Sequence, residues 1–288
     1  MASPITQHWL APAKLNLFLH ILDRRIDGYH NLETIFQFLD FGDEITFTRR
    51  DDNKINLTTP LFGVDNEDNL IVKAAQVIQN NIESEGPHGV DIQLNKRIPM
   101  GAGMGGGSSD AATTMLALNE LWQGDFSEEQ LLTLALQLGA DVPVFIAGKA
   151  CFAEGVGERM TPCQPPEDWF LVVTPKISIN TAQIFSHPAL TRNSKSLRIR
   201  APLNWDQLAD YRNDCEDVVR RLYPEVDEAL NILSEHGLAR LTGTGASVFS
   251  PFKNEDEARK IASLVPDSYN YFIAAANNES KGTKPIAD

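Results

Sequence analysis

Residues 99–112 read Pro99-Met100-Gly101-Ala102-Gly103-Met104-Gly105-Gly106-Gly107-Ser108-Ser109-Asp110-Ala111-Ala112, with five glycines among seven consecutive residues. The stretch follows a segment in which Val90, Ile92 and Leu94 alternate as in a β-strand, and it precedes apolar side chains at helical spacing. Because glycine has no Cβ, an anion can approach the main-chain amides of such a loop and the positive end of the helix behind it. The pattern predicts a phosphate-binding loop, with a tight turn that binds nothing as the plain alternative.

Two common phosphate-binding patterns fit this loop poorly. The G-x-G-x-x-G spacing of residues 101–106 matches the dinucleotide fingerprint, but residues 120–138 indicate helix, loop and helix where a second parallel strand is needed. The Walker A pattern requires Lys at the position where this chain has Gly107. Ser108 and Ser109 are expected to cap the following helix, contact phosphate oxygens or help to hold a metal ion.

The composition is that of an acidic globular protein. The chain has 288 residues, and its 42% hydrophobic content is enough for a sizeable core. We expect no nucleic-acid partner, because a protein with a formal net charge of −14 repels phosphate backbones at long range. The scattered cysteines lack a CxxC pair, which argues against disulfides and structural zinc. Neither a signal peptide nor a membrane-spanning run is recognised, so we expect a cytoplasmic protein without a membrane partner.

Strand and helix patterns are mixed along the chain without an internal repeat. Residues 13–21 alternate apolar and polar side chains as in a strand, which puts Lys14 and Asn16 on the face opposite the leucines. The composition changes beyond the middle of the chain, where a proline-containing linker is expected. The order of elements predicts an α+β architecture with two domains, residues 1–160 and residues 161–288.

Two further motifs accompany the glycine-rich loop. Pro12-Ala13-Lys14-Leu15-Asn16-Leu17 lies near the start of the chain, and Leu241-Thr242-Gly243-Thr244-Gly245-Ala246 lies near its end. Together with the loop, these motifs resemble those of the GHMP kinase superfamily, in the same order and over nearly the whole chain. Met104 stands where the family usually has Leu, which is an exchange of one apolar side chain for another.

Finer motifs resemble one branch of the superfamily, whose substrate is a cytidine-diphosphate-linked metabolite of the non-mevalonate isoprenoid pathway. They are Asp27-Gly28-Tyr29-His30, Leu138-Gly139-Ala140-Asp141-Val142-Pro143-Val144-Phe145 and Phe152-Ala153-Glu154-Gly155-Val156-Gly157-Glu158. The resemblance implies an N-terminal ribosomal-protein-like β-α domain, a C-terminal ferredoxin-like domain and an active site in the cleft between them. It also implies Mg²⁺-dependent phosphate transfer from ATP to the 2-hydroxyl of a small-molecule substrate. We expect a monomer or a weak homodimer.

Asp141 and Lys14 are the candidate catalytic residues. A carboxylate can orient an acceptor hydroxyl and receive its proton, but Asp141 fits equally well as the cap of a helix that begins at Val142. Lys14 by itself would be an ordinary solvated strand lysine. In the superfamily the matching lysine pairs with the aspartate, and this resemblance assigns Asp141 as the base and Lys14 as its partner.

The resemblance also assigns the binding residues. ATP contacts are expected from Pro99, Met100, Gly101, Ala102, Gly103, Met104, Gly105, Gly106, Gly107, Ser108, Ser109, Asn69 and Lys96. Substrate contacts are expected from Asn16, Tyr29, His30, Thr181, Phe185, Gly243, Thr244 and Gly245. Among them, Tyr29 and Phe185 would stack on the cytosine, and His30 would hydrogen-bond with its edge.

Plainer interpretations remain open for several of these residues. Asn69 fits a helix cap, Lys96 a surface side chain, Phe185 a core aromatic and residues 243–245 a hairpin turn. The alternative functions are a superfamily kinase acting on homoserine or a mevalonate intermediate, a nicotinamide-dependent dehydrogenase, and a nucleotide-binding regulator without catalysis. The missing second strand disfavours the dehydrogenase, and the lysine–aspartate pair disfavours the regulator.

Overall fold

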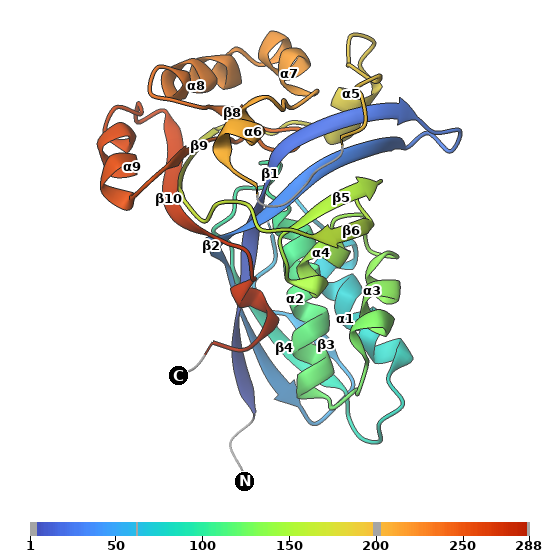
Figure 1. The fold of residues 1–288 in the computed structure, drawn as a ribbon. Coiled ribbons are helices and arrows are strands. Elements are labelled where there is room, and N and C mark those ends of the chain that lie inside the picture. Colours follow the sequence, from blue (N-terminus) through green and yellow to red (C-terminus); the bar gives the residue numbers. More distant parts are fainter. Residues whose placement is uncertain (1–4, 62, 198–202, 287–288) are drawn as a thin grey trace.

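Two long antiparallel strands, β1 (Thr6–Arg24) and β2 (His30–Arg50), run through both halves of the molecule (Figure 1). The computed structural model describes residues 5–61, 63–197 and 203–286. The hairpin end of the two strands lies against the C-terminal half, and their other end belongs to the sheet of the N-terminal half. Both halves are therefore built on the same pair of strands.

The central part of β1 is buried on both faces. Leu15, Leu17 and Phe18 lie in the core, and the polar residues Lys14 and Asn16 are only 3% exposed. The predicted strand is confirmed, but its polar face is covered, because the glycine-rich loop packs directly against it. The main-chain amide of Lys14 donates to the carbonyl oxygen of residue 104 at 3.1 Å.

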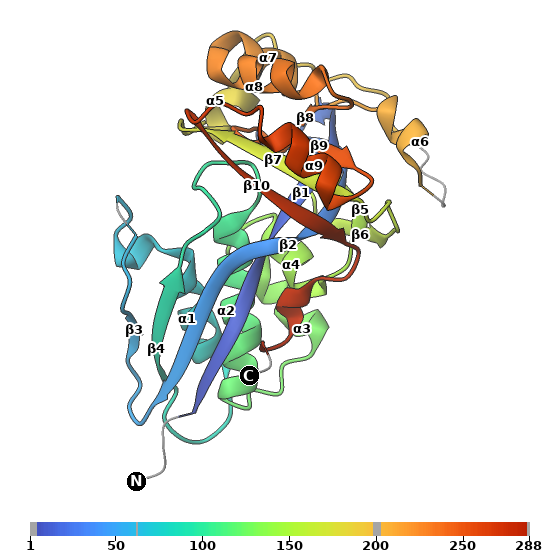
Figure 2. The same ribbon diagram turned by 90° about the vertical axis from the view of Figure 1, so that its left-hand side faces the viewer.

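The N-terminal half is a sheet with helices on one face (Figure 2). Apolar side chains of α1 and α2, such as Ile71, Ile78 and Leu118, pack against the sheet in one continuous core. The further elements of this half are β3 (Ile55–Leu57), η1 (Asn66–Asp68), α1 (Leu70–Asn81), β4 (Gly89–Asn95), α2 (Gly106–Leu121), α3 (Glu128–Ala135), α4 (Val142–Ala147), β5 (Cys151–Gly155) and β6 (Arg159–Pro162).

The C-terminal half is a second sheet covered by short helices. Strand β10 pairs with β7 along most of its length and then with β2 at Leu39 and Phe38, so the two sheets are continuous. The elements are β7 (Trp169–Pro175), α5 (Thr181–Ser186), α6 (Trp205–Ala209), α7 (Glu216–Leu222), α8 (Pro224–Ser234), β8 (Arg240–Leu241), β9 (Val248–Phe252), α9 (Glu255–Ala262) and β10 (Tyr269–Asn277). After β10 the chain returns to the N-terminal half, where η2 (Lys281–Thr283) lies against β1, α2 and α4. Strand order is β3-β4-β2-β10-β7-β9-β8, and β1, β5 and β6 pair outside this path.

This architecture confirms the predicted α+β fold with two domains. Residue 160 lies within β6, and the division of the chain at that point stays a prediction. Asn69 is a helix cap, as its plainer interpretation has it: its side chain caps α1, which spans Leu70–Asn81. Within the described ranges, no helix combines the length and the apolar character needed to cross a bilayer.

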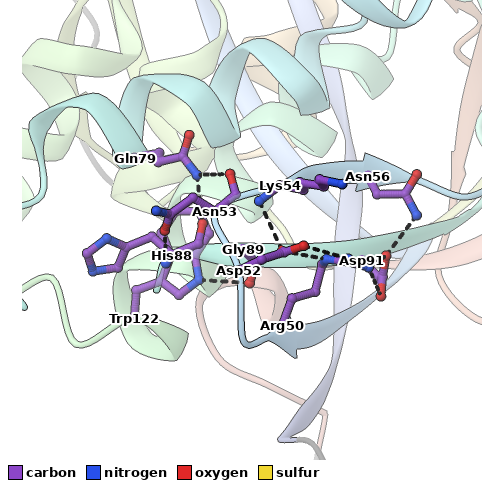
Figure 3. A network of polar contacts seen from close by, with 10 residues as sticks. All are labelled: Arg50, Asp52, Asn53, Lys54, Asn56, Gln79, His88, Gly89, Asp91 and Trp122. Carbon is purple, nitrogen blue, oxygen red and sulfur yellow. Dashed lines mark hydrogen bonds and ion pairs between the residues drawn. The ribbon is translucent and has the colours of Figure 1, made fainter. Parts of the chain in front are cut away.

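A polar network closes the end of the N-terminal half that lies far from the C-terminal domain (Figure 3). Arg50 pairs with Asp52 at 2.8 Å and with Asp91 at 2.9 Å, and so ties the turn after β2 to β4. The side-chain amide of Gln79 on α1 donates to the carbonyl oxygens of Asn53 and residue 88. These groups satisfy one another's hydrogen bonds, which is the ordinary role of such a network in joining a turn to its domain.

Candidate active site

A cavity of about 840 Å³ lies between the two halves of the molecule. Its walls come from β1, the turn between β1 and β2, the glycine-rich loop, the residues before α1 and α4, helix α5, and the loop between β8 and β9. Most of the predicted site residues line it, namely Lys14, Asn16, Tyr29, His30, Asn69, Lys96, Pro99, Met100, Gly101, Ala102, Gly103, Met104, Gly105, Gly106, Gly107, Ser108, Asp141, Thr181, Phe185, Gly243 and Thr244. Ser109 and Gly245 are absent from this lining.

The glycine-rich loop ends where α2 begins, and the first turn of α2 faces the cavity. Helix α2 starts at Gly106, and its N-cap residue, Gly105, makes no side-chain cap. The predicted capping by Ser108 or Ser109 is wrong, because both residues lie inside the helix. The Ser109 hydroxyl is buried and makes no hydrogen bond within the described residues. The uncapped amides of the first turn are therefore free for an anion.

The loop between β8 and β9 holds the glycine-rich loop in place. A Cβ on Gly103, whose φ is 75°, would lie 2.1 Å from the carbonyl oxygen of Thr242. The Thr242 hydroxyl donates to the carbonyl oxygen of Gly103 at 3.2 Å, and the amide of Ala246 donates to that of Gly101 at 3.1 Å. The third motif thus supports the glycine-rich loop and is not an isolated hairpin turn.

Lys14 and Asp141 meet at the wall of the cavity. The ammonium nitrogen of Lys14 lies 3.4 Å from Oδ2 of Asp141 and donates to Oδ1 of Asn16 at 2.5 Å. Asp141 occupies the N-cap position of α4, but its side chain makes no capping hydrogen bond. Its carboxylate, 36% exposed, therefore points to the cavity with Lys14 as its ion-pair partner. The residue pattern alone allowed Asp141 to be either a helix cap or a base, and the structure shows that its side chain does not cap α4.

Asn16 is fixed by hydrogen bonds on both sides of its amide group. Its Oδ1 accepts from Lys14, and its Nδ2 donates to the hydroxyl of Thr34 at 2.9 Å. Its main-chain amide donates to the Thr242 hydroxyl at 3.0 Å. Asn16 thus orients Lys14 within a buried network, which is a function that the sequence pattern did not predict.

Aromatic residues gather where the β1–β2 turn meets α5. Tyr29 is 63% exposed, whereas His30 is buried and stacks on Phe185 with a ring-centroid distance of 5.2 Å. Phe185 is only partly buried and lines the cavity, so it is not simply a core residue. The Thr181 hydroxyl lies 2.9 Å from that of Thr244, which joins α5 to the third motif.

Lys96 is held by two carboxylates that sequence reasoning did not single out. Its ammonium group lies 2.5 Å from Oδ2 of Asp43 and 2.7 Å from Oδ2 of Asp110. The surface interpretation of Lys96 is therefore wrong. Burial raises the pKa of Asp110 to about 8; the charge of Lys96 opposes this shift, and the charge of Asp43 adds to it. Burial by itself lowers the pKa of Lys96, but the charges of Asp110 and Asp43 outweigh it, so the pKa of Lys96 is raised. Asp110 directly follows Ser108 and Ser109 at the end of the glycine-rich loop, so its position near the site could have been noticed in the sequence. Nothing in the sequence around Asp43 indicates its contact with Lys96.

Comparison with known proteins identifies the family. The family model described as GHMP kinases N terminal domain matches residues 69–149, and the one described as GHMP kinases C terminal matches residues 187–270. A protein of Pseudomonas aeruginosa named 4-diphosphocytidyl-2-C-methyl-D-erythritol kinase is 55% identical over 94% of both chains. The chain belongs to this family of GHMP kinases. A protein of Marinobacter nauticus with the same name is 52% identical to this chain over 96% of both chains.

Solved structures agree with this GHMP kinase assignment. A crystal structure of 4-(cytidine 5'-diphospho)-2C-methyl-D-erythritol kinase superposes with a TM-score of 0.81 at 33% identity, over 93% of this chain and 98% of that one. A homoserine kinase from Cytophaga hutchinsonii superposes with a TM-score of 0.70 at 16% identity, covering 98% of this chain and 97% of that one, which shows the shared fold. This GHMP kinase is an ATP-dependent kinase.

Proposed function

We propose that this chain transfers the γ-phosphoryl group of ATP to the 2-hydroxyl of 4-diphosphocytidyl-2-C-methyl-D-erythritol, giving the 2-phosphate and ADP. The observation that carries the proposal is the Lys14–Asp141 pair, which lies in the same cavity as the glycine-rich loop and the aromatic cluster of Tyr29, His30 and Phe185. The relatives at 52–55% identity bear the name of that activity.

In the proposed reaction the acceptor oxygen attacks the γ-phosphorus, and the bond from this phosphorus to the β,γ-bridging oxygen breaks. The proton of the acceptor hydroxyl passes to the carboxylate of Asp141. The ammonium group of Lys14, 3.4 Å from this carboxylate, offsets the negative charge that develops on the transferring group. The protein supplies no covalent intermediate, so the rate comes from positioning and from charge stabilisation.

The phosphates of ATP would bind at the glycine-rich loop and the start of α2. There the uncapped amides and the missing Cβ atoms leave room for phosphate oxygens. Mg²⁺ commonly reaches such a site with the nucleotide and keeps several waters, so few protein ligands are needed. Ser108 could be such a ligand because it lines the cavity, whereas Ser109 is fully buried. Bound Mg²⁺ would neutralise phosphate charge.

The substrate would bind with its cytosine at the aromatic cluster and its methylerythritol near Asp141. Tyr29 offers an exposed ring at one side of the cavity, and Phe185 offers one on α5. The cytoplasmic location, the action as a monomer or weak homodimer, and the lack of a nucleic-acid partner stay predictions from the sequence.

Phosphorus NMR tests the proposed reaction directly. The purified protein is incubated with ATP, Mg²⁺ and the proposed substrate, and each component is omitted in turn. A new phosphomonoester signal that requires all three supports the proposal. If the signal instead appears with homoserine or mevalonate as the acceptor, the kinase assignment stands and the proposed substrate is wrong.

A further inference from the structure

The last described residues, 278–286, run from the end of β10 back to the N-terminal half, and we call this segment the strap (Figure 1). It forms an antiparallel bridge with the residues that directly follow α4. The Ser280 amide donates to the carbonyl oxygen of Gly148 at 2.8 Å, and the Ala150 amide donates to that of Asn278 at 2.8 Å. The strap therefore holds the C-terminal end of α4 through main-chain hydrogen bonds.

The strap also packs closely against β1, shortly before Lys14. A Cβ on Gly282 would lie 2.5 Å from Cδ of Pro12, which leaves no room for a side chain at this approach. The amide of Ile286 donates to a carbonyl oxygen of β1 at 2.7 Å. One segment thus contacts both the strand that carries Lys14 and the helix that directly follows Asp141.

The pair of Lys14 and Asp141 does not fix its own geometry. The ammonium nitrogen and Oδ2 are 3.4 Å apart, which is longer than the roughly 2.7–2.9 Å of a direct charge-assisted hydrogen bond. The Lys14 ammonium group is hydrogen-bonded to Asn16, and the Asp141 side chain makes no capping hydrogen bond with α4. The position of the carboxylate therefore depends on where α4 is held.

Helix α4 is short, so a displacement at one end reaches the other. It has six residues, of which 142–146 are buried, and spans about 9 Å. Gly148 ends the helix with φ of 61°, and a Cβ there would lie 2.3 Å from Cγ2 of Thr283 in the strap. Asp141 stands at one end and the strap holds the other. Because a close-packed interior transmits strain, a shift of the strap would move the carboxylate.

We propose that the strap positions Asp141 for proton transfer by holding α4 and β1 at a fixed separation. The proposal rests on the function proposed above, in which Asp141 receives the proton of the acceptor hydroxyl. No residue of the strap lines the cavity, so these are positioning residues that act through α4. A misplacement of about 1 Å can lower the rate of the chemical step by about 100-fold. Loosening the strap should therefore lower kcat and leave substrate binding nearly unchanged.

The first experiment removes the amide donor with Ser280→Pro. The backbone suits proline, because φ of Ser280 is −66° and Glu279 before it lies in the extended bridge. We expect kcat to fall by about tenfold or more, while KM for ATP and for the cytidine substrate stays within about twofold of the wild type. Ser280→Ala is the matched control, because it keeps the amide and removes only the hydroxyl that accepts from Gly282. Its kcat should stay well above that of Ser280→Pro.

The same substitution in Asp141→Asn separates positioning from a general loss of structure. Without the carboxylate, its placement no longer affects the rate, so Ser280→Pro should change the residual kcat by less than about twofold in this background. All rates are measured well below the melting temperature of each variant. An equal fractional loss of kcat in both backgrounds would mean that the strap only supports the fold, and would overturn the proposal.

A second pair of variants keeps the test open if Ser280→Pro fails to fold. Gly148→Ala places a Cβ against the methyl group of Thr283, and we expect it to lower kcat. Thr283→Ser removes this methyl group, so the double variant should regain part of the lost kcat. Failure of Thr283→Ser to restore any activity would count against the strap as the cause.

Hydrogen exchange of the α4 amides supplies a readout that does not depend on activity. We expect these amides to exchange faster in Ser280→Pro than in the wild type and in Ser280→Ala, because the helix has lost its anchor. Faster exchange with unchanged kcat would overturn the positioning role. A wild type that does not phosphorylate the cytidine substrate would contradict the proposed function alone. The strap is then judged by the exchange rates, and unchanged exchange in α4 would overturn its role in holding the helix.

Discussion

The ammonium nitrogen of Lys14 lies 3.4 Å from Oδ2 of Asp141, although one residue belongs to the first strand and the other precedes α4. The same ammonium group lies 3.4 Å from the carbonyl oxygen of Gly103 and 4.8 Å from the ring centroid of Phe36. Lys14 thereby links the carboxylate of Asp141 to the glycine-rich loop. Its ammonium group contacts both the proposed base and the proposed phosphate site.

Replacement of Asp141 by Asn tests its role as the base. The amide keeps the shape of the side chain but cannot accept the proton, and it weakens the attraction to Lys14. We expect kcat to fall by about 100-fold or more, while the melting temperature stays nearly unchanged, because the Asp141 side chain caps no helix. Glu129→Gln on the exposed face of α3 is the control for removal of one negative charge. Near-normal turnover in Asp141→Asn would exclude this residue from proton transfer.

Replacement of Gly103 by Ala tests how closely the third motif supports the glycine-rich loop, the proposed phosphate site. The new Cβ would overlap the carbonyl oxygen of Thr242 at 2.1 Å, on a backbone with φ of 75°. We expect a loss of about 2–5 kcal/mol in the free energy of unfolding, together with loss of ATP binding. Urea denaturation and nucleotide titration measure the two effects.

The control for this change is Gly107→Ala in the first turn of α2. A Cβ at Gly107 would meet only a methyl carbon of Leu70, at 3.5 Å, and the position is helical. Alanine should therefore stabilise the protein slightly, by about 0.5–1 kcal/mol. Equal destabilisation by both substitutions would mean that the loop is generally intolerant and that the contact with Thr242 is not the cause.

The fold and much of the site follow from local patterns in the sequence. The loop at 99–112, the strand containing Lys14 and the helix that starts after Asn69 are each set by neighbouring residues, so spacing was enough to predict them. The three motifs could be placed in one site because the family resemblance orders them along the chain. The burial of β1 on both faces could not be predicted, because it depends on segments from both halves of the molecule.

The missed residues act through contacts between distant segments. Asp43 reaches Lys96 across paired strands, and Arg192 reaches His30 from a segment that has no regular secondary structure. A lone aspartate or arginine in such a segment has no spacing that distinguishes it from a solvated surface residue. Only the three-dimensional arrangement shows that these charges hold side chains that face the cavity.

Replacement of Tyr29 by Ala tests the stacking surface for the base. Tyr29 is 63% exposed in the turn between β1 and β2, so the free energy of unfolding should change by less than about 0.5 kcal/mol. The KM for the cytidine substrate should rise by about 5- to 100-fold, as expected for one lost stacking contact, and the KM for ATP should stay within about twofold of the wild type. Tyr271→Ala on β10 is the control, with 50% exposure outside the cavity wall. Equal effects on both substrates would contradict the stacking role.

Replacement of Asp110 by Asn tests the buried charge cluster around Lys96. In addition to its contact with Lys96, Asp43 accepts hydrogen bonds from the main-chain amides of Arg97 and Ile98 at 2.6 and 2.7 Å. Oδ1 of Asp110, in contrast, is buried without a hydrogen-bond partner among the described residues. Two carboxylates share one ammonium group, so Asp110 is the one that retains a proton, and its pKa is raised by burial first. Asparagine resembles that protonated form and still accepts from Lys96.

The raised pKa of Asp110 has a definite consequence for stability. Between the unfolded pKa near 4 and the higher folded pKa, the folded protein binds more protons than the unfolded chain. The free energy of unfolding should therefore fall as the pH rises through this window. In Asp110→Asn, which has no carboxyl group to titrate, this fall should be smaller by about 1–3 kcal/mol. Urea denaturation at several pH values from 5 to about 9 measures the two slopes, with Glu129→Gln as the control that keeps the wild-type slope. Parallel curves for the wild type and Asp110→Asn would mean that Asp110 is ionised in the folded protein, and that Lys96 satisfies both carboxylates.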